Sequence, residues 1–318
     1  MGNYIIEMKN NLTSYAFYNK LLPRLHDYYV KHMLEKLVFD FSEVKSIDPT
    51  VIPNLLCMGY IISTYSNQPA EILISNNIIR TDLKRYLNEI KFMYYAEKYG
   101  LFCFDDSLKG GWDQAKMSPL NTTLLFNSTE KEEETWSKLI RTNNFLSRYL
   151  SEFNIINNNS NLILELSKEI IQNSKIHGKS FSFMTLQYNY LKEKVYLSYS
   201  DCGIGFLNSL KNRGELLSNE LEAICEGIFS RYDKPFGLYN VISKIINKNG
   251  IVRIHSNNTQ LILSNKDIIQ FDIIKSANSL KNSLNLQTQV RNNIKYAGVH
   301  IEIELPLCKE EIIYDNQF

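Results

Sequence analysis

Cysteine is scarce in this chain of 318 residues, which holds five cysteines and no closely spaced pair. An odd, dispersed set argues against a disulfide framework and against a zinc site, and it fits the reducing cytosol. The five are Cys57, Cys103, Cys202, Cys225 and Cys308.

Long hydrophobic runs are also missing. The longest, VIPNLLCMGYII at 51–62, is too short to span a bilayer and predicts a buried helix instead. The N-terminus has no basic segment followed by an apolar run, so we expect no signal peptide. These absences predict a cytoplasmic protein without a membrane partner.

Charge of one sign is lacking as well, because 35 Lys and Arg residues face 34 Asp and Glu residues. A net charge of +1 gives no strong field to attract nucleic acid, and we expect no nucleic-acid partner. The hydrophobic fraction of 44% is typical of a globular protein, and the length favours two domains.

The first half alternates short apolar runs with helical patterns, which predicts an α/β domain with a mixed sheet at 1–108. One helix should begin at Pro49 with Asp48 as its N-cap. Strands are expected at 3–8, 37–41, 71–75 and 102–104, and helices at 14–33 with a bend at Pro23, 49–65 and 81–90.

A segment rich in glycine and small polar residues, 109–129, is predicted to be a linker. The second domain should cover 130–310, with a polar insertion at 266–296 and a tail at 311–318. Its helices are expected at 130–153, 162–177 and 237–248, and its strands at 183–191, 194–200, 251–255, 261–264 and 299–305.

One predicted helix carries a polar line beside an apolar line. The polar residues recur every four positions, so they share one helix face. They are Glu165, Glu169, Asn173 and His177, and the apolar line is Leu162, Leu166 and Ile170. A solvated helix face often has this pattern, but the neighbouring apolar line indicates a half-buried helix whose polar side faces a site.

Asp201, Gly203 and Gly205 follow a predicted strand. Glycines at a strand end let the backbone turn sharply and approach a ligand, and the aspartate can accept a hydrogen bond from an amino group. A simple glycine turn is the alternative.

Gly237 and Leu238 open a later helix, where free N–H groups can bind an anion. Lys234 and Arg231 lie just before them and could add positive charge, although loop cations are usually only solvated.

These three motifs, in this order, resemble the GHKL ATP-binding fold over about 130–307, and the form IIQNSKIHG is most similar to anti-sigma-factor serine kinases. The resemblance implies an α/β sandwich, a mixed sheet covered by helices on one face. It also implies ATP and Mg²⁺ as ligands.

The resemblance implies a role for each motif residue. Asn173 would bind Mg²⁺ and ATP, Glu169 would be the general base, and Asp201 would hold the adenine amino group. The ATP-binding set is completed by His177, Gly203, Gly205, Lys234, Gly237 and Leu238, with 207–235 as the lid. The third motif has the single Gly237, and Val299 stands where many relatives have threonine, so binding is favoured over turnover.

The stretch LVFDFSEVKSIDPTVIPNLL, within 1–105, is similar to STAS domains, the fold of anti-sigma-factor antagonists. Those antagonists are phosphorylated on a serine at the position that Pro49 occupies here. The resemblance therefore implies an interaction module rather than a phosphate acceptor.

Two functions remain open from the sequence. The first is an ATP-dependent regulatory protein with ATPase or Ser/Thr kinase activity and regulatory protein partners, for which a homodimer is one option. The alternative is a non-catalytic ATP-sensing module. A histidine kinase ranks lower, because His26 and His32 lie in the wrong half and the 130–153 helix has no histidine.

Overall fold

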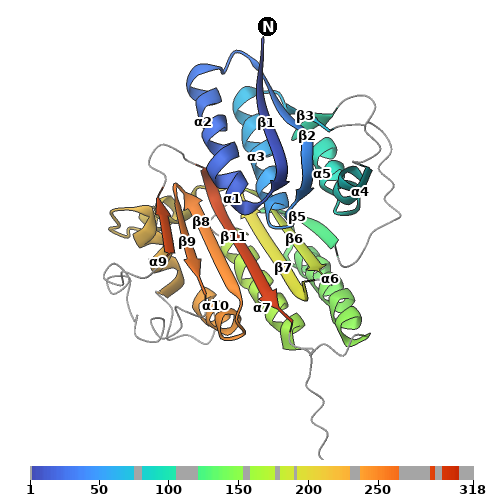
Figure 1. The fold of residues 1–318 in the computed structure, drawn as a ribbon. Coiled ribbons are helices and arrows are strands. Elements are labelled where there is room, and N and C mark those ends of the chain that lie inside the picture. Colours follow the sequence, from blue (N-terminus) through green and yellow to red (C-terminus); the bar gives the residue numbers. More distant parts are fainter. Residues whose placement is uncertain are drawn as a thin grey trace, which may run out of the picture.

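The computed structural model shows a mixed α/β protein with one parallel and one antiparallel sheet (Figure 1). It describes residues 2–74, 81–104, 121–152, 158–175, 180–189, 192–229, 237–264, 287–290 and 296–307. None of the described helices is long and apolar enough to cross a membrane.

The first sheet has the order β1-β2-β3-β4, and every pairing in it is parallel. The expected mixed sheet is therefore wrong for this part. Its strands are β1 (Asn3–Leu12), β2 (Lys36–Ile47), β3 (Ala70–Leu73) and β4 (Phe102–Phe104). Parallel neighbours need long crossovers, which the helices between these strands supply.

The helices of this part are α1 (Ser14–Ala16), the π-helical η1 (Phe17–Leu21), α2 (Leu22–Lys31), α3 (Val51–Ser66), α4 (Thr81–Glu89) and α5 (Phe92–Lys98). The expected 14–33 helix is thus interrupted by a π turn. Pro23 occupies the first turn of α2, where its missing N–H removes no helical bond. The N-cap of α3 is Thr50, so the prediction of Asp48 as the cap was wrong.

The second sheet has the order β10-β9-β8-β11-β7-β6-β5 and is antiparallel throughout, so a mixed sheet is wrong here too. Its strands are β5 (Asn121–Asn127), β6 (Phe181–Asn189), β7 (Lys194–Asp201), β8 (Ile251–Asn257), β9 (Thr259–Leu263), β10 (Gln287–Val290) and β11 (Tyr296–Pro306). The helices are α6 (Glu132–Glu152), α7 (Asn158–Asn173), α8 (Gly205–Lys211), α9 (Glu220–Phe229) and α10 (Leu238–Asn247).

Two strands of this sheet lie where the sequence predicted none. β5 falls in the expected 109–129 linker and pairs with β6 along all of its length. β10 falls in the expected 266–296 insertion and pairs with β9. Both corrections have one physical reason, because each strand is defined by its partner strand rather than by a strong local pattern.

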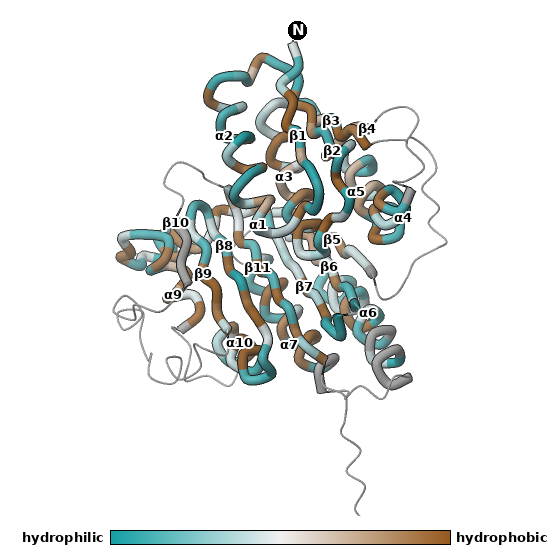
Figure 2. The backbone as a smooth tube through the Cα atoms, viewed as in Figure 1, coloured by the Kyte–Doolittle hydropathy of each residue, from teal (hydrophilic) through white to brown (hydrophobic). Residues whose placement is uncertain are grey.

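The two sheets meet through α3. This helix contacts β6 and β7, and every residue from Val51 to Gly59 is buried. A helix that is apolar on nearly all sides must be covered on nearly all sides, and Figure 2 shows α3 as largely hydrophobic. The other face of the large sheet packs on α7 and α10, whose apolar side chains share one core with it (Figure 1).

Candidate functional site

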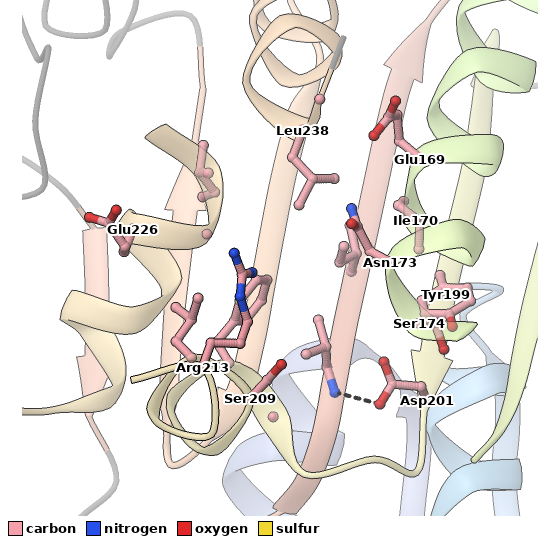
Figure 3. A pocket seen from close by; sticks show the side chains of 18 of the residues that line it. Glu169, Ile170, Asn173, Ser174, Tyr199, Asp201, Ser209, Arg213, Glu226 and Leu238 are labelled. Carbon is pink, nitrogen blue, oxygen red and sulfur yellow. Dashed lines mark hydrogen bonds between the residues drawn. The ribbon is translucent and has the colours of Figure 1, made fainter. Parts of the chain in front are cut away.

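A cavity of about 400 Å³ lies between α7, the strands β7 and β11, the α8–α9 region and the start of α10 (Figure 3). Six of the nine residues predicted from sequence line it. They are Glu169, Asn173, Asp201, Gly205, Gly237 and Leu238. Gly203 is not among the lining residues, and its backbone N–H donates to Oδ1 of Asp201. His177 and Lys234 lie outside the described residues.

Helix α7 presents Glu169 and Asn173, one turn apart, to this cavity (Figure 3). The expected apolar line of the same helix is buried in the core, as predicted, and this fixes the rotation of the helix. Glu165 does not join the site. It is exposed and forms an ion pair of 2.8 Å with Lys244 of α10, so the polar line splits between a site and a surface contact.

Asp201, at the end of β7, is only 4% exposed. Its Oδ1 accepts hydrogen bonds from the backbone N–H of Gly203 at 2.9 Å and of Val299 at 3.2 Å. Burial raises the pKa of Asp201 to about 6, and the two N–H donors only partly oppose this. These two bonds hold Oδ1 in place. The other oxygen, Oδ2, is turned toward the cavity (Figure 3), where it can accept a hydrogen bond from a ligand.

Gly298 makes the close approach of β11 to Asp201 possible. Its φ of +98° is unfavourable for other residues, and a Cβ there would lie 1.8 Å from the Asp201 backbone oxygen. The register of β11 shifts between Tyr296 and Val299 at this point. The bulge thereby directs the Val299 N–H toward the carboxylate of Asp201.

The turn after Asp201 is held by Glu220, a buried residue that the sequence did not single out. Its carboxylate accepts bonds from the side chains of Ser256 and Asn257 and from the N–H of Leu207. Gly205 has φ +79°, and a Cβ on it would meet Ser256 and Asn257. The positive φ and these two side chains favour glycine at this turn.

The opposite end of the cavity has the features of an anion site. Gly237, with φ +129°, is the N-cap of α10 and makes no side-chain cap, and the positive end of a helix dipole favours an anion at such an N-terminus. Arg213 also lines the cavity, and Figure 3 shows its guanidinium pointing inward. In the sequence, Arg213 stood out only as a member of the expected 207–235 lid. The sequence signal that could have identified Arg213 was a cation directly before a glycine, Gly214.

Ser174 and Tyr199 were also missed. They line the cavity beside Asp201 and are 6% and 1% exposed. Tyr199 lies two positions before Asp201, and strand residues two apart share a face. That spacing was the signal that could have found it.

The described residues hold no cluster of three His, Cys, Asp or Glu side chains able to bind a metal ion. The Asn173 amide oxygen is a single oxygen ligand of the type that Mg²⁺ accepts. It fits an ion that takes its remaining ligands from phosphate and water. Comparison of the chain with protein-family models, curated proteins and solved structures found no match in any of the three.

Proposed function

We propose that this protein binds Mg-ATP in the α7–β7–α10 cavity through a GHKL-type ATP-binding domain, and that a STAS-like N-terminal domain couples the bound nucleotide to protein partners. One observation carries the proposal. Glu169 and Asn173, Asp201, and Gly237 come from three separate motifs and line one cavity. Three unrelated surface patterns would have no reason to converge in this way.

The two ends of the cavity suit the two ends of a nucleotide. Buried Asp201 presents a carboxylate oxygen, which can accept from the exocyclic amino group of adenine. Gly237 leads into the α10 N-terminus, the positive end of the helix dipole, and Arg213 adds a cation. Both suit phosphates. Mg²⁺, when bound, would neutralise phosphate charge, and Asn173 would hold it.

Glu169 is placed to act as a base. It lies one helical turn before Asn173 and faces the same cavity. In the proposed reaction it takes a proton from water or from a Ser/Thr hydroxyl as that oxygen attacks the γ-phosphorus and ADP leaves. Water gives an ATPase, and a protein hydroxyl gives a Ser/Thr kinase.

Coupling to the N-terminal domain follows from strand alternation. On β7, Tyr199 and Asp201 line the cavity, whereas Ser198 and Ser200 donate hydrogen bonds to Thr50 and Asn54 of the N-terminal part. A shift of the strand on nucleotide binding therefore reaches α3 directly. This arrangement supports a regulatory protein more than a free-standing ATPase.

The test is binding of ATP with and without Mg²⁺, followed by release of phosphate or labelling of a partner. Glu169→Ala should retain binding and lose turnover. Asn173→Ala should remove the Mg²⁺ dependence of binding, while Gln172→Ala, on the exposed side of the same helix, should behave as the wild type.

A second candidate is a non-catalytic ATP-sensing module. It is favoured by the single glycine at Gly237, which makes a thin phosphate cradle. The two candidates differ in the expected effect of Glu169→Ala. A sensor binds Mg-ATP without turnover, so this substitution should not change what it does. Failure of wild-type protein to bind ATP would exclude both.

A further inference from the structure

Tyr199 lines the cavity together with Asp201 and carries a buried hydroxyl. The Tyr199 side chain is 1% exposed, and its hydroxyl has no hydrogen-bond partner among the described residues. It lies near the hydroxyls of Ser174 and Ser182 without a well-formed bond to either. A buried polar group without a partner costs free energy, so its presence calls for a ligand or a structural reason.

The location favours a ligand. Tyr199 and Ser174 line the cavity next to Asp201 (Figure 3). Burial and the nearby Asp201 carboxylate raise the pKa of Tyr199 well above its usual value. The phenol therefore stays protonated and is a hydrogen-bond donor.

An acceptor beside a donor in the protein matches the Watson–Crick edge of adenine, or of cytosine, and does not match that of guanine. Adenine presents its amino group, a donor, next to N1, an acceptor. Guanine presents an oxygen acceptor next to an N–H donor, which reverses the pattern. The Asp201 carboxylate would face the guanine oxygen without a proton between them, and that pairing is repulsive.

We propose that Tyr199 is a base-specificity residue: its hydroxyl donates to N1 of adenine while Asp201 accepts from the amino group. The inference rests on the proposed ATP site, and it assigns the base contact to a residue outside the three sequence motifs. The Val299 side chain, on the facing strand β11, has no hydroxyl to perform this role.

The test compares ATP with 1-deaza-ATP, which has C–H in place of N1, in wild-type protein and Tyr199→Phe. Wild-type protein should bind 1-deaza-ATP about threefold to tenfold more weakly than ATP, as expected for one hydrogen bond. Tyr199→Phe should weaken ATP by a similar factor and bind both nucleotides equally. 7-Deaza-ATP, which keeps N1, should bind the wild-type protein like ATP and should be weakened by Tyr199→Phe by the same factor as ATP.

Stability without nucleotide separates this role from a structural one. Since the hydroxyl has no partner among the described residues, Tyr199→Phe should leave the melting temperature unchanged or raise it. Tyr29→Phe is the matched control, because the Tyr29 hydroxyl is also buried without a partner among the described residues and lies on α2, away from the cavity. It should leave ATP affinity unchanged.

Two results would overturn the inference while leaving the ATP site intact. One is wild-type protein that binds ATP and 1-deaza-ATP equally. The other is Ser174→Ala, rather than Tyr199→Phe, abolishing the difference between the two nucleotides. Lack of binding by any nucleotide would instead remove the proposed function itself.

Discussion

Asn54 of α3 and Glu302 of β11 are joined by a hydrogen bond of 3.1 Å across 248 positions of sequence. Asn54 is fully buried, and its side-chain oxygen accepts from Ser200 at 2.9 Å. Its backbone oxygen accepts from Tyr296 at 2.5 Å. The residue Asn54 thus connects α3, in the N-terminal part, to β7 and β11. These two strands also line the proposed nucleotide site.

Asn54→Ala should lower the free energy of unfolding by about 2–4 kcal/mol. The substitution leaves Glu302 and Ser200 buried without their partner, and each lost partner costs about 1–3 kcal/mol. Urea unfolding at pH 7 measures the change. Gln68→Ala, at an exposed position just after α3, should stay within about 0.5 kcal/mol of the wild type. An equally small effect at Asn54 would mean that the network contributes little to the contact between the two parts.

Glu302 should make the protein less stable as pH rises. Burial raises the pKa of Glu302 to about 7 from its ordinary 4.5, although Ser14, Arg253 and Asn54 partly oppose this. Between these values the folded state keeps a proton that the unfolded state releases. The free energy of unfolding therefore falls with rising pH, by at most about 1.4 kcal/mol per pH unit, and levels off above pH 7.

Glu302→Gln removes this ionisation, so it should also remove the part of the fall in the free energy of unfolding that Glu302 causes. Relative to the wild type, the variant should gain on the order of 2 kcal/mol between pH 5 and pH 8. Denaturant unfolding at both pH values gives this difference. Glu133→Gln, at an exposed position of α6, should follow the wild-type curve, and parallel curves for Glu302→Gln would contradict a raised pKa at Glu302.

ATP binding should weaken in acid because of Asp201. The adenine amino group needs an ionised acceptor, and Asp201 has a pKa of about 6 in the free protein. Affinity should be constant above this value and fall by up to tenfold per pH unit below it. Calorimetric titration between pH 5 and pH 8 measures this change. Asp201→Asn should bind ATP poorly at every pH, and its residual pH dependence reports ionisation of the phosphates alone.

The parts that could be read from sequence are those that depend on local spacing. The apolar line of α7 follows the helical repeat, so its buried face and the inward side of Glu169 and Asn173 were predictable. Gly203 and Gly205, which follow Asp201, predict a turn from the local sequence alone. These patterns need no knowledge of distant partners.

The parts that could not be predicted depend on contacts between distant segments. Asn54 is simply a polar residue within an apolar helix until β7 and β11 are placed against it. The role of Tyr199 depends on α7 and that of Glu220 on β8, and β5 is a strand because β6 lies beside it. Sequence spacing does not encode such neighbours, so the motif residues were found and their supporting residues were not.

Gly298→Ala should be among the most damaging small substitutions in this chain. The new Cβ would lie 1.8 Å from the Asp201 backbone oxygen at a φ of +98°, so β11 must move away from β7. Gly214→Ala is a matched control, since Gly214 has φ +91° and nothing within 4 Å of the added Cβ. Backbone strain alone should cost the control about 1 kcal/mol, whereas Gly298→Ala should cost more than about 3 kcal/mol. Urea unfolding compares the two.

Displacing Val299 also takes its N–H from Asp201, so any folded Gly298→Ala protein should bind ATP more weakly than Gly214→Ala. Equal stability of the two variants would show that β11 does not need this close approach.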